Sequence, residues 1–102
     1  MGGLVVVAKK SDIPNGQGKL VEVAGKKIAL FNVNGEFCAI DNTCTHAGGP
    51  LSEGELSGTE VTCPLHGATF DVKTGKTLGG PARSDVSRYV VKVEGEDVSV
   101  EI

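Results

Sequence analysis

Short β-type runs separated by glycine-rich turns dominate this chain, and no stretch carries an apolar helical stripe for three turns. Asn34-Gly35 is a strong two-residue hairpin signal between two of these runs. The C-terminal run predicts a second hairpin that turns at residues 94–97. The predicted strands cover 4–8, 19–25, 27–33, 36–41, 59–63, 68–72, 76–78 and the two arms of the hairpin within 87–102. A single helical turn at 82–86 is the one exception that we expect.

Alternation within the last hairpin supports the strand assignment. Tyr89, Val91 and Val93 would share one face, with Arg88 and Lys92 on the other. Val98, Val100 and Ile102 alternate with polar residues in the same way. The fold class predicted is all-β: a small antiparallel β-sandwich or barrel over residues 1–102 as one domain, with a loop-rich subdomain at about 42–82 inserted between strands.

Charge and composition exclude several classes of function. The net charge of −3 comes without a cluster of Lys and Arg, so nucleic-acid binding is not expected. The longest apolar run near the start, residues 4–8, is far too short to span a membrane and lacks the features of a signal peptide. Three cysteines argue against a disulfide framework. We therefore expect a soluble, cytoplasmic and monomeric protein.

Two close Cys/His pairs carry the chemistry: Cys44 with His46, and Cys63 with His66, with sixteen residues between the inner members. Thiolate and imidazole are ligands for transition metals, and two tight loops could direct all four side chains to one point. Plain core packing and a Cys–His nucleophile remain alternatives, although the nucleophile leaves one pair unexplained. Structural zinc usually pairs like with like, Cys with Cys and His with His, so the mixed pairing disfavours zinc without excluding it.

The four residues and both short spacings resemble the Rieske iron–sulfur signature. The segments CTHAGGPLSEGEL, CPLHGATFDVKTGK and GGPA are similar to small Rieske ferredoxins, and residues 36–83 carry most of this likeness. The resemblance implies one [2Fe–2S] cluster, with Cys44 and Cys63 on one iron and His46 and His66 on the other. It also implies that the loop at 79–82 covers the cluster and excludes water.

The resemblance further predicts a low reduction potential. High-potential Rieske proteins carry an extra cysteine in each cluster loop and a Ser two residues after the second His, whereas this chain has Ala47, Gly48, Leu65 and Ala68 at such places. We therefore expect a potential of about −150 to −100 mV, at the low end of the Rieske range. Cys38 is interpreted as a small buried hydrophobe, and Asp41-Asn42 as a brace for the first loop through side-chain to backbone bonds.

An uncharged collar around the cluster is expected to dock redox partners. The expected surroundings of the cluster, including this collar, are Thr45, Ala47, Gly48, Leu65, Gly67, Ala68, Gly80 and Pro81. By resemblance, the chain would carry electrons from an NAD(P)H-dependent flavoprotein reductase to a terminal oxygenase such as an aromatic-ring dioxygenase, and would not be an enzyme alone. A small subunit of assimilatory nitrite reductase and a zinc-stabilised interaction module are the alternatives.

Overall fold

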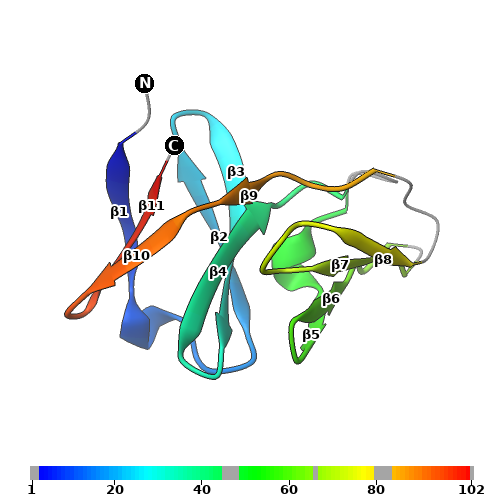
Figure 1. Cartoon of the computed structure of the whole chain (residues 1–102), viewed down its shortest axis with the longest axis horizontal. Helices are drawn as coiled ribbons and strands as arrows, with labels where there is room; N and C mark the ends of the chain where they lie inside the picture. The colour runs from blue at the N-terminus through cyan, green and yellow to red at the C-terminus, as the bar shows by residue number, and fades with distance from the viewer. Residues whose placement is uncertain (1–2, 45–48, 66, 80–83, 102) are drawn as a thin grey trace.

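In this computed structural model, three antiparallel sheets lie side by side along the long axis of the molecule (Figure 1). The structure describes residues 3–44, 49–65, 67–79 and 84–101. The first sheet has the order β1 (Leu4–Lys9), β11 (Asp97–Glu101), β10 (Val91–Glu94). The middle sheet has the order β2 (Gly18–Val23), β3 (Lys26–Val33), β4 (Glu36–Asp41), β9 (Arg88–Tyr89). The third has the order β5 (Glu55–Ser57), β6 (Glu60–Thr62), β7 (Thr69–Asp71), β8 (Thr77–Gly79).

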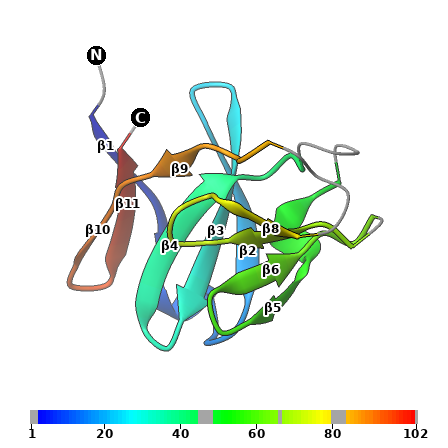
Figure 2. The ribbon, with the colours of Figure 1, turned by 45° about the vertical axis from the view of Figure 1, so that its right-hand side comes forward.

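Strands β3 and β4 of the middle sheet are buried on both faces over most of their length, which explains the apolar run at residues 28–31 of β3. Ile28 and Leu30 pack into a core shared with the first sheet, which also contains Val98 and Val100. The intervening residues of β3, with Phe31 among them, pack into a second core that includes residues of the third sheet. Since successive side chains of a strand point to opposite faces, one continuous apolar strand serves two cores. Figure 2 shows the third sheet beside the middle one in a second view.

The two hairpins of the middle sheet close through left-handed backbone conformations. Asn34 and Gly35 have φ values of 53° and 90°, as the Asn-Gly signal predicts for a turn of this kind. Ala24 and Gly25 adopt the same pair of conformations, with φ values of 52° and 79°. The register that follows pairs Val33 with Glu36 and Ile28 with Asp41, and β4 ends two residues short of Cys44.

The all-β prediction is confirmed: all elements of the described residues are strands, apart from two short 3-10 turns, η1 (Lys10–Asp12) and η2 (Leu51–Glu53). Strand β4 matches its predicted range, and the other predicted strands shift at their ends. Strand β5 was not foreseen, and the described part of the expected helical turn, residues 84–86, is not helical.

The predicted first arm of the final hairpin is also interrupted, since it forms two strands, β9 and β10. Tyr89 pairs with Ala39 in the middle sheet, but Val91 pairs with Val100 in the first sheet. The chain therefore changes sheets at Val90, so the expected common face of residues 89, 91 and 93 does not lie on one strand. No helix among the described residues is both long and apolar enough to cross a membrane.

Candidate iron–sulfur site

Both cysteines of the predicted site are buried where loops leave the sheets. Cys44 follows β4 and is 2% exposed; Cys63 follows β6 and is 1% exposed. Both belong to the core that joins the middle and third sheets. The remaining predicted ligands, His46 and His66, lie outside the described residues, as do Thr45, Ala47, Gly48, Gly80 and Pro81 of the predicted collar.

The two thiols lie side by side and are not joined by a disulfide. All three cysteines of the chain are free, and the thiols of Cys44 and Cys63 are within hydrogen-bond contact of each other. Burial raises the pKa of the Cys63 thiol; a hydrogen bond from the Leu65 backbone opposes this rise, and the adjacent Cys44 thiol adds to it.

Backbone hydrogen bonds close each loop at its cysteine. The Cys44 N–H donates to the Gly49 carbonyl at 2.9 Å, and the Cys63 N–H donates to the Ala68 carbonyl at 2.7 Å. An antiparallel bridge between Thr43 and Pro50 lies immediately outside the first of these bonds. The loop stems are therefore held by main-chain contacts, which leave the thiols free to act as ligands.

Gly49 brings the backbone of the first loop against the second. A Cβ atom at Gly49 would lie 2.7 Å from Cys63 Sγ and 3.1 Å from Leu65 Cγ. A real side chain does not tolerate the first distance, so only glycine allows the loops this close together. The sequence showed a glycine here, but its reason is visible only when both loops are in place.

Of the predicted brace Asp41-Asn42, only Asn42 makes a side-chain to backbone bond at the first loop; the Asp41 carboxylate accepts from Ser87 and Tyr89 instead. Asn42 is buried, and its side-chain oxygen accepts the Ser52 N–H at 2.9 Å. Its backbone carbonyl accepts the Leu51 N–H at 2.7 Å, and its own N–H donates to the Lys27 carbonyl at 3.0 Å. Asn42 thus ties the stem of the loop both to the turn η2 and to the middle sheet.

The described part of the predicted collar divides into exposed and buried residues. Leu65 is 44% exposed, and Gly67 is exposed with a φ of 75° that favours glycine. Ala68 is fully buried, so it can belong to the surroundings of the site but not to a docking surface.

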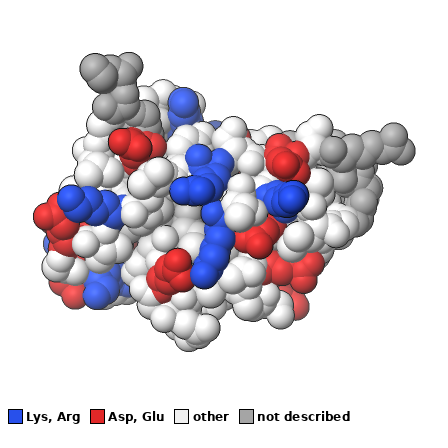
Figure 3. Space-filling view, viewed as in Figure 1, with Lys and Arg blue, Asp and Glu red and all other residues white. Residues whose placement is uncertain are grey.

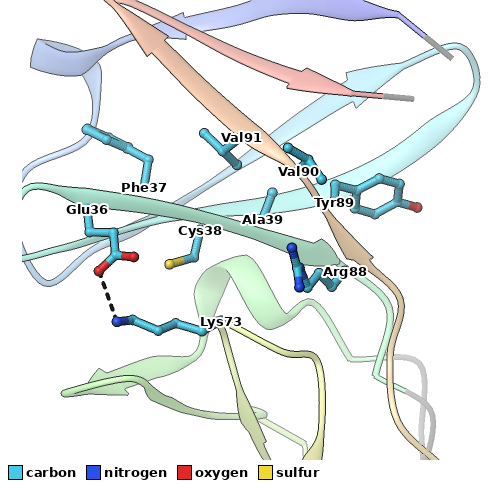
Figure 4. Close-up of a pocket in the computed structure, with 9 residues that line it drawn as sticks. All are labelled: Glu36, Phe37, Cys38, Ala39, Lys73, Arg88, Tyr89, Val90 and Val91. Carbon is cyan, nitrogen blue, oxygen red and sulfur yellow. Dashed lines mark ion pairs between the residues drawn. The ribbon is translucent and has the colours of Figure 1, made fainter.

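Cys38 lies outside this site, although it belongs to the same core. It lines a hollow of about 260 Å³ with the ion-paired Glu36 and Lys73, whose charged atoms are 2.9 Å apart (Figure 4). Its sulfur points toward Lys73, away from Phe37 on the opposite face of β4. Burial, then the charge of Glu36, raises the pKa of the Cys38 thiol, which suits the predicted role as a small buried hydrophobe.

Two adjacent buried thiols can supply the cysteine ligands of an iron–sulfur cluster. Thiolates hold the iron of such clusters, and imidazoles replace two of them in Rieske centres. Within the described ranges no three His, Cys, Asp or Glu side chains form a metal-binding group, and both histidines of the chain fall outside those ranges. The donors that can be located are consistent with the cluster.

Charges of both signs are interspersed on the face seen in Figure 3. Blue Lys and Arg side chains lie beside red Asp and Glu side chains across the middle of this face, with no single-sign field over it. A surface of this kind offers little electrostatic preference for a strongly charged polymer.

Sequence comparisons place this site in a known family. The model of the Rieske [2Fe–2S] domain matches residues 3–93. The chain is 47% identical over 91 residues to the ferredoxin component of the naphthalene 1,2-dioxygenase/salicylate 5-hydroxylase systems of a Ralstonia species, covering 89% of this chain and 88% of that one. It is 44% identical over 93 residues to the 3-phenylpropionate/cinnamic acid dioxygenase ferredoxin subunit of Shigella flexneri, covering 90% and 87%.

Solved structures agree with this. A chain from the complex of reduced oxygenase and oxidized ferredoxin in carbazole 1,9a-dioxygenase superposes with a TM-score of 0.89 at 34% identity, covering 95% of this chain and 91% of that one. A nitrite reductase NADPH small subunit superposes with a TM-score of 0.84, covering 96% and 97%, but at 21% identity this shows the fold alone. The chain belongs to the Rieske [2Fe–2S] domain family, and it is a ferredoxin with one Rieske-type cluster, an electron-transfer component rather than an enzyme in its own right.

Proposed function

We propose that the chain carries single electrons from an NAD(P)H-dependent flavoprotein reductase to a terminal oxygenase of the aromatic-ring dioxygenase type. The relatives named as ferredoxin components of naphthalene and phenylpropionate dioxygenase systems support this role. The structural neighbour from a complex of oxygenase and ferredoxin supports the oxygenase as a partner. The likeness to the nitrite reductase small subunit is one of fold alone.

The observation that carries the proposal is the pair of free, buried thiols, Cys44 and Cys63, held beside each other by two closed loops. In this proposal they bind one iron, and His46 and His66 bind the other. Residues of about 42–82 then form the cluster-binding subdomain of a single domain. When bound, the cluster supplies a site that takes up and releases one electron.

The protein's own part is to hold the cluster rigidly and to present it. The hydrogen-bonded stems at Cys44 and Cys63 limit rearrangement of the ligand loops. Leu65 places an exposed apolar side chain in the second loop. We infer that Leu65 belongs to the contact surface for both partners, together with the collar residues Thr45, Ala47, Gly48, Gly80 and Pro81. Small, uncharged contacts favour brief association, as electron carriers require.

We also infer a monomer that works in the cytoplasm. All three thiols are free, which suits a reducing compartment. The potential in this proposal is about −150 to −100 mV, low for a Rieske centre, and a midpoint above about +100 mV would contradict it.

Reconstitution tests the function. The purified protein is added to the reductase and oxygenase of a naphthalene dioxygenase system, and the hydroxylated product is measured against NADH consumed. We expect product formation only when the chain is present, and a strong decrease for Leu65→Glu, because that change places a charge in the apolar contact surface. Full cluster content without any transfer of electrons to the oxygenase would contradict the proposed partner.

A further inference from the structure

The carboxylate of Asp41 joins the stem of the first ligand loop to residues 87–89. Asp41, the last residue of β4, accepts the hydroxyl of Tyr89 at 2.5 Å through Oδ1. Its Oδ2 accepts the Ser87 N–H at 3.3 Å, and its own N–H donates to the Ser87 carbonyl at 2.9 Å. Three hydrogen bonds thus converge from one residue on the segment 87–89, which lies 46 to 48 positions away in the sequence.

The hydroxyl bond is the shortest of these three contacts. A donor–acceptor distance of 2.5 Å is at the short limit for a hydrogen bond from a hydroxyl to a carboxylate. The Lys26 ammonium lies 5.8 Å from the centre of the Tyr89 ring, within the range of a cation–π contact. Burial, the hydrogen bond and the charge of Asp41 raise the pKa of Tyr89 to about 12, so its hydroxyl stays protonated as a donor.

The position of this contact connects it to the site. Only Asn42 and Thr43 separate Asp41 from Cys44, and both are fixed by hydrogen bonds or by a β-bridge. On the other side, the Val86 N–H donates to the Gly75 carbonyl at 2.8 Å, which ties the segment 84–89 to the turn between β7 and β8. Asp41 therefore adjoins the hydrogen-bonded stem that carries Cys44.

We propose that Asp41 and Tyr89 form a clamp that positions the first ligand loop against the segment 84–89 and so holds the cluster ligands in register. The inference rests on the proposed function, since it requires Cys44 to be a cluster ligand. Neither residue touches the cluster in this proposal; both are positioning residues. A purely structural role would instead affect the stability of the fold and leave the cluster environment unchanged.

The test compares Tyr89→Phe and Asp41→Asn with wild type and with the control Asp12→Asn. Asp12 also accepts a hydrogen bond from a backbone N–H, that of Lys9 at 2.9 Å. It lies in the exposed turn η1, which follows β1 of the first sheet. The readouts are the loss of visible cluster absorbance in a chelator and the electron paramagnetic resonance spectrum of the reduced protein. Both are taken at a temperature at which circular dichroism shows all four proteins folded.

We expect both clamp variants to lose the cluster about tenfold faster than wild type. This is the lower end of the loss in metal affinity that follows when a residue supporting a metal ligand is removed. Their resonance spectra should shift, while Asp12→Asn keeps the wild-type rate and spectrum. If Asp41→Asn does not fold, Tyr89→Phe decides alone, because it removes one oxygen and keeps the ring.

Wild-type rates and spectra in Tyr89→Phe would overturn the clamp while leaving the proposed function intact. Equal acceleration in Asp12→Asn would overturn it as well, since general destabilisation would then explain the loss. Wild-type protein without any iron–sulfur signal would instead refute the proposed function, and the clamp with it.

Discussion

Replacing Gly49 with Ala tests the close contact between the two cluster loops. The new Cβ would lie 2.7 Å from Cys63 Sγ, 3.1 Å from Leu65 Cγ and 3.2 Å from Leu65 Cδ1. Optimal contacts between nonbonded heavy atoms are about 3.5–4.0 Å, so the overlap with sulfur is about 1 Å. The φ of Gly49 is not in the left-handed region, and the substitution therefore tests the contact rather than backbone strain.

Leu65 can move aside because it is half exposed, but Cys63 is 1% exposed and packed in the core that joins the middle and third sheets. We expect the thiol to be displaced from its place beside Cys44. Overpacking of this kind costs about 1–3 kcal/mol of unfolding free energy. For a domain of this size, a loss of about 2 kcal/mol lowers Tm by about 8–16 °C.

The assay measures iron, acid-labile sulfide and Tm of Gly49→Ala beside Gly3→Ala. The control glycine also lacks a left-handed φ, and its Cβ would meet no described atom within 4 Å. We expect cluster content to fall in the first variant and to remain near wild type in the control. Full cluster content and an unchanged Tm in Gly49→Ala would refute the reasoning that places Cys63 Sγ against this loop.

Three further predictions concern single side chains. His66→Cys should keep a cluster, if any, at a markedly lower potential by voltammetry, because a thiolate adds negative charge to one iron; an unchanged potential would show that His66 is not a ligand. Tyr89 is the only tyrosine of the chain, so its near-ultraviolet titration should have its midpoint at about 12 rather than 10.0. Since its folded pKa is raised, the stability that the neutral phenol contributes is complete below pH 10.0 and is lost toward about pH 12, a loss that Tyr89→Phe should lack in alkaline melts. In the cluster-bound protein, Cys38 should be the one thiol that is not a ligand, and it should react slowly with a thiol reagent until the fold opens; rapid native labelling would contradict its burial.

Local signals predicted much of the fold. Asn34-Gly35 located a hairpin, and the run after it gave β4 with its correct ends, because turn chemistry and strand pattern agree there. Strand β5 escaped prediction, since three residues between two glycines carry too little alternation. The break at Val90 was also invisible, because the apolar pattern continues while the strand changes sheets.

Spacing picked out two candidate ligands, Cys44 and Cys63, that the structure brings together, but it did not predict the residues that support them. The bracing role of Asn42 followed from its place before the loop, whereas its partner Ser52 did not. The contact between Asp41 and Tyr89 depends on the pairing of β4 with β9, for which the sequence holds no local signal.

The central claim is that two cysteines and two histidines hold one two-iron cluster. The chain has only two histidines, so protein labelled with ¹⁵N in histidine gives a direct test by electron spin echo spectroscopy of the reduced state. The account predicts two iron and two sulfide per chain, with couplings from two histidine nitrogens, as in a Rieske centre. Zinc in place of iron, or a reduced cluster without any histidine coupling, would contradict it.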